Sequence, residues 1–141
     1  MLLPHAWRIC CEKALEVMKL DCLRGTGGLP ILRLYDCDDD EAAQFMSAVR
    51  LLGSGREQKI LVHALPYVIA INGCGLTLVQ KSWDQAILKT GPVEFECGFT
   101  TATWDNIADL LEPFVDGSHG YQIISGSPGE AELLFSASGD W

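Results

Sequence analysis

The sequence predicts one α+β domain over residues 1–141, in which about three helices pack on one face of a single, largely antiparallel sheet. Apolar residues recur at helical spacing in separate stretches, and shorter apolar or alternating stretches lie between them. Several of these predicted strands follow one another through short turns, which favour antiparallel pairs. Helices in α+β domains gather on one side of the sheet, and 141 residues are typical of a single domain.

The first predicted helix covers residues 5–22. Its apolar residues follow the i, i+3, i+4 spacing of one buried stripe. The stripe consists of Trp7, Cys10, Cys11, Ala14, Leu15, Met18 and Cys22. The glycine-rich turn after Arg24 ends this helix and lacks the glycine spacing of a phosphate-binding loop. Residues 31–35, which follow Pro30, form the first predicted strand.

The acidic run of residues 36–41 has two interpretations. Hard divalent cations prefer several carboxylates, so the run could bind a metal ion. Asp38 or Asp39 could instead cap a helix, whose dipole is stabilised by acids in the first turn. The helical apolar stripe in residues 42–52 favours capping, and no spaced series of calcium ligands is present. Gly53 begins the turn that ends this second helix.

Three further strands are predicted at residues 59–65, 67–71 and 76–80. Asn72 and Gly73 lie between the last two and predict a hairpin, because a type I′ turn needs positive φ at both central positions. Residues 82–85 match a capping box, which predicts a short helix that ends at Lys89.

Residues 93–99 alternate strictly, with Glu94 and Glu96 on the side opposite the apolar residues. This pattern predicts a half-buried strand whose outer face carries two carboxylates. Thr101 or Thr103 is expected to cap a third helix, which Pro113 limits or kinks. The final strands are predicted at residues 121–125 and 130–136, and their short connection favours an antiparallel pair.

Charge is distributed unevenly along the chain. All ten basic residues and ten of the 19 acidic residues lie before Thr90, so the formal net charge of −9 belongs entirely to residues 90–141. An acidic chain does not suit nucleic acid or anionic membranes, which are themselves polyanions. It does suit a basic protein, because opposite charges steer association. The sequence therefore predicts a basic protein partner.

The six cysteines form no CxxC pair and no cysteine–histidine spacing typical of a zinc site. They lie in apolar stretches, so reduced and mostly buried thiols are expected. No apolar run is long enough to span a bilayer, and the N-terminal sequence does not match a signal peptide. We therefore expect a cytoplasmic protein that uses no metal or other cofactor.

Few residues indicate catalysis. His119, in a glycine-flanked turn, is the one histidine expected to serve as an exposed acid or base. No GxSxG, HExxH or Walker sequence occurs. A small ligand-binding or catalytic domain that uses His119 and nearby carboxylates is the alternative to a non-enzymatic binding protein. A subunit of a larger assembly, or an acidic domain whose charge serves only solubility, are further alternatives.

The residues expected to contact a partner all come from the acidic last third of the chain. Acids would steer the encounter, and an aromatic residue would supply a desolvated anchor. The acids are Glu94, Glu96, Asp105, Asp109, Glu130, Glu132 and Asp140, and the anchor is Tyr121 or Trp141.

The chain ends in Gly139 and Trp141, after a predicted strand that contains Glu132, Leu133 and Leu134. This ending resembles the GxW terminus of bacterial polymorphic-toxin immunity proteins. The resemblance implies a non-enzymatic protein that binds one cognate toxin domain and blocks that domain's active site.

Overall fold

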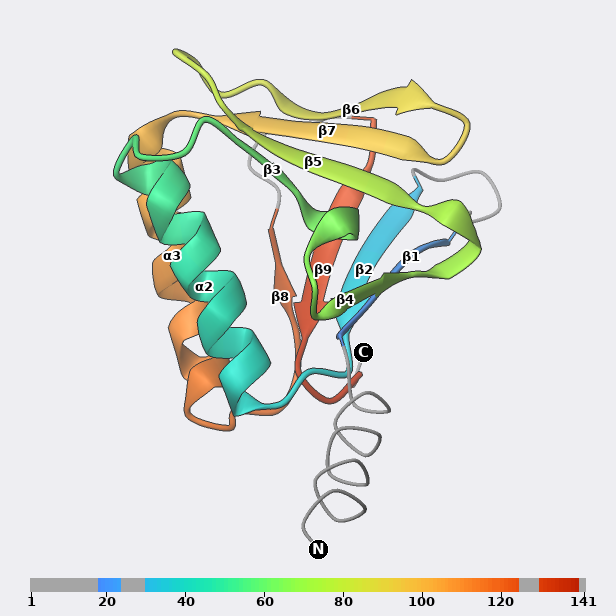
Figure 1. Cartoon of the computed structure of the whole chain (residues 1–141), viewed down its shortest axis with the longest axis vertical. Helices are drawn as coiled ribbons and strands as arrows, with labels where there is room; N and C mark the ends of the chain where they lie inside the picture. Colours follow the sequence, from blue (N-terminus) through green and yellow to red (C-terminus); the bar gives the residue numbers. More distant parts are fainter. Residues whose placement is uncertain (1–17, 24–29, 125–129, 140–141) are drawn as a thin grey trace, which may run out of the picture.

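The computed structural model describes residues 18–23, 30–124 and 130–139. Over these residues the protein is α+β, with two α-helices and two mixed sheets (Figure 1). The helices are α2 (Asp39–Gly53) and α3 (Thr101–Val115). Two short 3-10 turns, η1 (Val62–Ala64) and η2 (Ile71–Gly73), connect strands.

The larger sheet contains five strands in the order β4-β1-β2-β9-β8. They are β1 (Met18–Leu23), β2 (Ile31–Tyr35), β4 (Val68–Ala70), β8 (Gln122–Ile123) and β9 (Glu132–Ser136). The smaller sheet contains four strands in the order β3-β5-β7-β6. They are β3 (Lys59–Leu61), β5 (Gly75–Gln80), β6 (Ala86–Gly91) and β7 (Glu94–Phe99). Figure 1 shows the smaller sheet running across the upper end of the larger one.

The prediction of a single, largely antiparallel sheet with about three helices is wrong. The pairs β1–β4, β2–β9 and β5–β7 are parallel, and the strands divide between two sheets. The prediction assumed that strands close in sequence pair with each other. Instead β9, the last strand, lies between β2 and β8. Partner choice of this kind depends on how whole apolar faces are buried together, which a local pattern does not encode.

The hairpin predicted at Asn72 and Gly73 is also wrong, although both residues have the expected backbone conformation. Their φ angles are 54° and 72°, positive as a type I′ turn requires. The flanking strands nevertheless belong to different sheets, because β4 pairs with β1 while β5 pairs with β3 and β7. This turn therefore carries the chain from the larger sheet to the smaller one.

The capping box at residues 82–85 does not begin a helix. Residues 86–91 form β6 instead, antiparallel to β7 at an edge of the smaller sheet. Asp84 instead supports the start of a different helix: its carboxylate accepts hydrogen bonds from Thr100 N (2.9 Å) and Thr103 Oγ1 (2.9 Å) at the start of α3. The bond from the Thr100 amide is the main cause of the lowered pKa of Asp84.

Of the helix predicted over residues 5–22, residues 5–17 lie outside the described residues. Residues 18–22 belong to β1, so this part of the prediction is wrong. Met18 and Leu20 are completely buried, and they alternate with Lys19 and Asp21 on the opposite face. Such a period of two is typical of a strand. Met18 also fits the helical spacing of the apolar residues before it. The apolar pattern alone therefore did not distinguish a helix from a strand at residues 18–22.

The expected cap of the second helix, by Asp38 or Asp39, is confirmed with Asp38, whereas the expected cap of the third helix by Thr101 or Thr103 is wrong. Glu41 N donates to the Asp38 carboxylate (2.8 Å), and Asp38 N donates to the Glu41 carboxylate (3.0 Å), which completes a capping box at α2. Helix α3 begins slightly earlier than expected, because Thr100 rather than Thr101 or Thr103 is its N-cap. The antiparallel pair of final strands is confirmed by β8 and β9.

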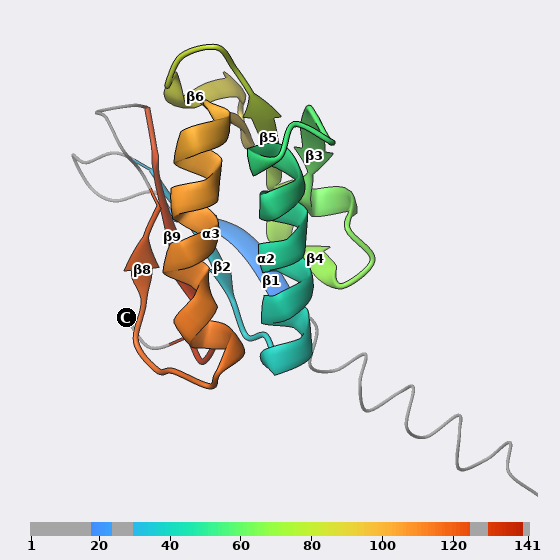
Figure 2. The ribbon, with the colours of Figure 1, turned by 90° about the vertical axis from the view of Figure 1, so that its left-hand side faces the viewer.

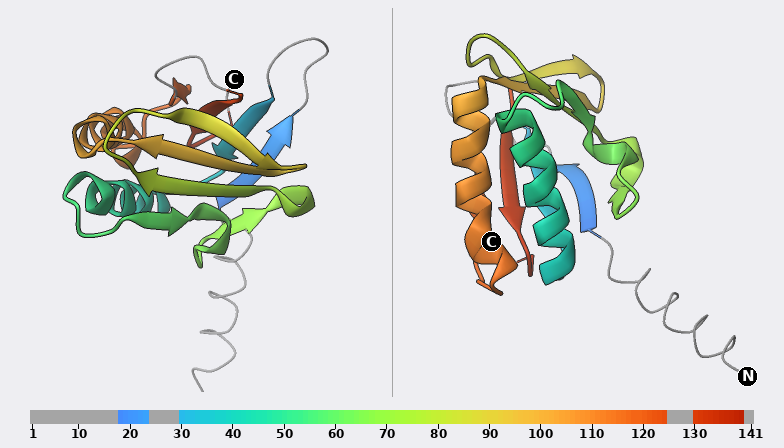
Figure 3. Two further views of the ribbon diagram at one scale, coloured as in Figure 1. Left: turned by 90° about the horizontal axis from the view of Figure 1, so that it is seen from above. Right: turned by 60° about the vertical axis from the view of Figure 1, so that its left-hand side comes forward.

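One core joins both sheets to the helix pair. Phe135 of β9 stacks on Phe45 of α2, with ring centroids 5.7 Å apart, and lies 5.0 Å from the ring of Phe114 of α3. Trp104 of α3 meets Phe99 of β7 edge-on at 5.1 Å, so α3 also contacts the smaller sheet. Figure 2 shows the two helices side by side, and the view from above in Figure 3 shows the smaller sheet lying over the larger one.

Phe135 is the ring that both helices contact, which allows a stability test. We expect Phe135→Ala to lower the free energy of unfolding by about 3–5 kcal/mol, because loss of a large buried ring leaves a cavity. Ile123→Ala, at an exposed position on the neighbouring strand β8, is the control and should change it by less than about 1 kcal/mol. Urea denaturation followed by circular dichroism measures both. Equal losses in the two variants would contradict this role for Phe135.

Candidate protein-binding surface

The larger sheet has one face in the core and one toward solvent. We call the second face the outer sheet face, and it consists of Lys19, Asp21, Leu23, Ile31, Arg33, Tyr35, Ile69, Ile123, Glu132 and Leu134. Helices α2 and α3 pack on the opposite side of this sheet, through Phe45 and Phe114. Leu23, Ile69 and Ile123 on the outer sheet face have exposed fractions of 44%, 48% and 44%.

Strand register arranges the outer sheet face in cross-strand rows. Two of these rows are Asp21–Arg33–Leu134–Ile123 and Ile69–Lys19–Tyr35. Directly opposed side chains in a sheet lie within contact distance of each other. The charged residues on β1 and β2 are therefore flanked by exposed apolar residues on the edge strands β4 and β8.

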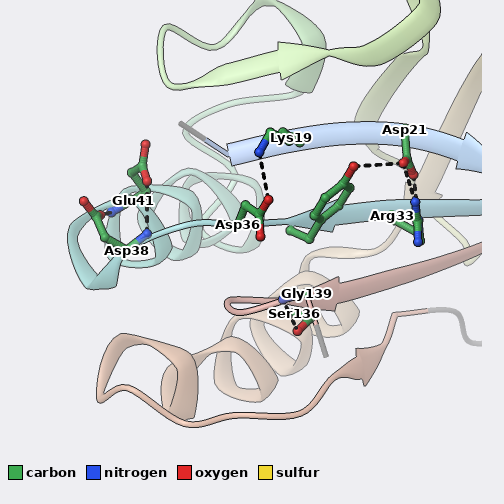
Figure 4. A network of polar contacts seen from close by, with 9 residues as sticks. Lys19, Asp21, Arg33, Asp36, Asp38, Glu41, Ser136 and Gly139 are labelled. Carbon is green, nitrogen blue, oxygen red and sulfur yellow. Dashed lines mark hydrogen bonds and ion pairs between the residues drawn. The ribbon is translucent and has the colours of Figure 1, made fainter. Parts of the chain in front are cut away.

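Asp21 and Arg33 form a two-pronged ion pair at the centre of this face (Figure 4). Arg33 Nε donates to Asp21 Oδ1 (2.8 Å), and Arg33 Nη2 donates to Asp21 Oδ2. Tyr35 OH donates to the same Oδ2 at 3.0 Å, and the Arg33 guanidinium lies 5.0 Å from the centroid of the Tyr35 ring. Asp21 is only 8% exposed, so its carboxylate depends on these donors in place of water.

These contacts keep the donors protonated. The hydrogen bond to Asp21 raises the pKa of Arg33, while burial, followed by the bond to Asp21, raises the pKa of Tyr35. Lys19 forms a second ion pair with Asp36 (2.8 Å), and this hydrogen bond raises the pKa of Lys19. Lys19, Arg33 and Tyr35 therefore keep their protons near neutral pH.

The C-terminal segment is fastened beside the same network. Gly139 N donates to Ser136 Oγ (3.0 Å), and Cys37 N donates to Ala137 O (3.0 Å), so the chain after β9 is tied to the loop before α2. Gly139 has a φ of 79°, and a Cβ there would lie 3.3 Å from Asp36 Oδ1. Positive φ and close approach both favour glycine, which explains one residue of the GxW ending by local structure. Trp141 lies outside the described residues.

Glu94 and Glu96 lie on the solvent side of the smaller sheet, as their alternation predicts. Their neighbours Phe95 and Cys97 are buried in the core. Glu94 is exposed, whereas Glu96 is half-buried and accepts a hydrogen bond from Gln85 Nε2 (3.2 Å). This pair therefore belongs to a different sheet from the outer sheet face.

Asp105 and Asp109 lie on α3 and contact α2. Asp109 pairs with Arg50 of α2 at 3.1 Å, an exposed pair of the kind that contributes at most about 1 kcal/mol. Asp105 lies against Gly53, where any added Cβ would collide with its carboxylate. Both acids therefore take part in contacts between the helices.

Glu130 protects an edge strand. Its own N–H donates to Ile87 O (2.7 Å), and its carboxylate accepts a hydrogen bond from Lys89 N (2.8 Å). Ile87 and Lys89 belong to β6, whose other edge pairs with β7. Glu130 thus satisfies edge groups that would otherwise be available to another strand.

Among the residues predicted to bind a partner, Glu132 lies on the outer sheet face and is exposed. Tyr121 immediately precedes β8 and is 51% exposed. Asp140 lies, with Trp141, outside the described residues. The predicted acids are therefore spread over the smaller sheet, the helix pair and the outer sheet face rather than gathered on one of them.

Sequence reasoning missed most of the outer sheet face. Ile31 and Ile69 were assigned to strands without a surface role, Leu23 was assigned to no element, and Asp21 and Arg33 were not considered. A partial signal for the ion pair is present, since Asp21 and Arg33 carry opposite charges within two largely apolar stretches, although Lys19 is a second charged residue in the first of them. It could not be used without the register that places residue 21 opposite residue 33.

His119 lies in a small hollow of about 160 Å³ that Cys37, Asp39 and Ser118 also line. Sites for organic ligands usually have about 300–1,000 Å³, so this hollow is small for a substrate. Burial, followed by Glu41, raises the pKa of Cys37 to about 12, so the thiol does not ionise near neutral pH. The hollow offers an imidazole and a carboxylate but no activated nucleophile among these residues.

Comparisons with known proteins add no assignment. No protein-family model, no curated protein sequence and no solved structure matches this chain. In the part of the chain that the structure describes, no three histidine, cysteine or acidic side chains are grouped so that they could hold a metal ion. No helix within residues 18–23, 30–124 and 130–139 is long and apolar enough to cross a membrane.

The role of Glu130 can be tested by amide exchange. Glu130→Ala removes the acceptor of the Lys89 N–H, which costs about 1 kcal/mol and should speed exchange of that amide roughly fivefold. Glu132→Ala, two residues further along the chain and on the outer sheet face, should leave the Lys89 amide unchanged. Hydrogen exchange followed by NMR measures both variants. Unchanged exchange in Glu130→Ala would refute edge protection by this residue.

Alkylation rates test whether the buried thiols of Cys37 and Cys74 are unreactive. Burial raises the pKa of both Cys37 and Cys74 to about 12, from an ordinary value of 9.0. At pH 8 the thiolate fraction should be about a thousandfold lower than in the unfolded chain, and alkylation correspondingly slower. Iodoacetamide labelling with peptide mass spectrometry, in buffer and in urea, measures this. Rapid labelling of Cys37 in the folded protein would instead support an activated thiol beside His119.

Proposed function

We propose that the protein is a non-enzymatic binding protein that neutralises a basic partner domain in the cytoplasm, in the manner of an immunity protein, and that the outer sheet face is its docking surface. The observation that carries this proposal is the combination of exposed Leu23, Ile69 and Ile123 with the part-buried ion pair of Asp21 and Arg33. Single exposed apolar residues are common, but several on one sheet face are typical of an interaction surface.

The two components of this face would contribute differently to binding. Each apolar side chain would gain about 25 cal/mol for every Å² removed from water. Arg33 and Tyr35 are of the residue types enriched at the centres of interfaces. Asp21 already holds the side chains of Arg33 and Tyr35 in place through hydrogen bonds. Binding would therefore cost little further side-chain entropy at these two residues.

Charge would act over a longer range. The formal net charge of −9 favours the approach of a basic partner and raises the association rate, mainly at low salt. Glu132, on the outer sheet face, would lie at the contact itself. Asp109, which pairs with Arg50 in the helix layer, would act only through the overall field. Neutralising Glu132 should therefore slow association more than neutralising Asp109.

The test begins with the partner. The full chain is used to capture proteins from the lysate of its source cell, with elution in salt steps, and one stoichiometric basic protein is expected. Ile69→Asp and Ile123→Asp should each weaken its binding by roughly tenfold or more, because a buried carboxylate would then face the partner. Leu110→Asp is the matched control, since Leu110 is 42% exposed but lies on α3. Titration calorimetry measures all three.

Two results would overturn the proposal. One is equal weakening by the Ile69, Ile123 and Leu110 variants, which would locate binding elsewhere. The other is a folded, monomeric protein that captures no basic partner at any salt concentration. That result would favour the alternative of a ligand-binding or catalytic domain that uses His119 and the neighbouring Asp39.

A further inference from the structure

Two cysteines lie at the junction between the two sheets, away from the outer sheet face and from the hollow beside His119. Cys22 lies near the end of β1. Cys74 lies between η2 and β5, at the point where the chain crosses from the larger sheet to the smaller one. Both are reduced thiols. Cys74 is only 2% exposed, whereas Cys22 is half-buried and therefore the more accessible of the two.

The pairing of β1 with β4 brings the two cysteines close together. Leu20 is opposite Ala70 in this parallel pair, and neighbouring strands lie about 4.8 Å apart. The turn η2 follows Ala70 directly and packs against β1 (Figure 1). Cys74 N donates to Ile71 O (3.1 Å), and such a turn holds its first and last Cα atoms within about 7 Å of each other. Cys74 therefore lies beside the end of β1 that carries Cys22.

Both side chains also belong to the same side of β1. Alternate residues of a strand share a face, so Cys22 is on the face of the completely buried Leu20. Cys74 is part of the hydrophobic core, and Cys22 packs against this core. Burial is the main cause that raises the pKa of Cys74 to about 12, and the charge of Cys22 is the next. The two thiols therefore interact with each other inside the junction.

We propose that Cys22 and Cys74 form a reversible disulfide when the protein reacts with a low-molecular-weight disulfide such as oxidised glutathione. The thiolate of Cys22 attacks one sulfur of the small disulfide, which releases one glutathione thiolate and leaves a mixed disulfide. The Cys74 sulfur then attacks Cys22 Sγ, and the second glutathione thiolate leaves. The protons of the two protein thiols pass to the two glutathione thiolates. Two protein thiols are thus oxidised while one small disulfide is reduced.

The bond would lock the junction between the sheets. It ties β1 to the start of β5 and closes a loop of about 50 residues, which restricts the unfolded chain strongly. Because burial keeps Cys74 protonated near neutral pH, ring closure is slow for a thiol, but the high effective concentration of the two sulfurs favours it. The inference does not depend on the proposed function, since both side chains pack against the core and not on the outer sheet face.

Oxidation of the unmodified full chain tests this inference. Dilute reduced protein is incubated with oxidised glutathione, the remaining thiols are alkylated in urea, and peptide mass spectrometry without reduction identifies the disulfides. We expect Cys22–Cys74 to be at least roughly tenfold more abundant than any other intramolecular pair, because few pairs have bridging geometry. The oxidised protein should melt roughly 10 °C higher than the reduced protein. Dithiothreitol should reverse both changes.

Alanine variants separate the roles of the two cysteines. Cys74→Ala should stop at the mixed disulfide of Cys22 with glutathione and should show no rise in Tm. Cys97→Ala is the matched control, because Cys97 is a comparably buried cysteine in β7, and it should keep both the disulfide and the rise. Cys22→Ala changes the less buried position, and it should show neither the mixed disulfide nor the rise even if Cys74→Ala fails to fold.

Four results would overturn the proposal. One is a mixed disulfide of Cys22 with glutathione that persists in the unmodified protein. Another is a disulfide of Cys22 with a different cysteine, in the same chain or in a second copy. The third is no oxidation of Cys22 at all, and the fourth is a rise in Tm that survives in Cys74→Ala. The first two would show that the junction does not hold the Cα atoms at the separation of about 4.4–6.8 Å that a disulfide requires.

Discussion

The packing of Phe135 between Phe45 and Phe114 is the contact on which the arrangement of layers depends. It joins the last strand of the larger sheet to both helices at once. Because β9 is parallel to β2 and antiparallel to β8, its register also aligns the two neighbouring strands. A shift of one residue would turn Phe135 toward solvent and Leu134 into the core. The same contact therefore determines which residues form the outer sheet face.

The ion pair of Asp21 and Arg33, unlike the aromatic core, contributes little to stability. A buried charge pair is a weak source of stability, because desolvation offsets much of the attraction. Its retention on the outer sheet face, with Tyr35 completing the hydrogen bonds, gives a rigid polar centre among exposed apolar residues. Surfaces that combine apolar area with preorganised polar groups lose little affinity on binding, which is the physical basis for proposing this face as a docking surface.

The acidic residues do not form a single functional group in the structure. Asp109 joins the two helices through Arg50, and Glu130 satisfies the free edge of β6. Glu94 and Glu96 lie on the smaller sheet. Their shared contribution is therefore to the electrostatic field of the whole molecule, whose formal net charge is −9. The ion pair on the outer sheet face, by contrast, comes from residues early in the chain and carries no net charge.

The sequence by itself determined the features that depend on neighbouring residues. The capping box of Asp38 and Glu41, the alternation around Glu94 and the positive φ of Asn72 follow from local sterics and hydrogen bonding, and each is present. Only the tertiary structure decided which strands pair, because burial of whole faces selects partners such as β2 and β9 that are distant in sequence. The outer sheet face follows from that pairing, since the register that opposes Asp21 to Arg33 is a property of two strands together and of neither alone.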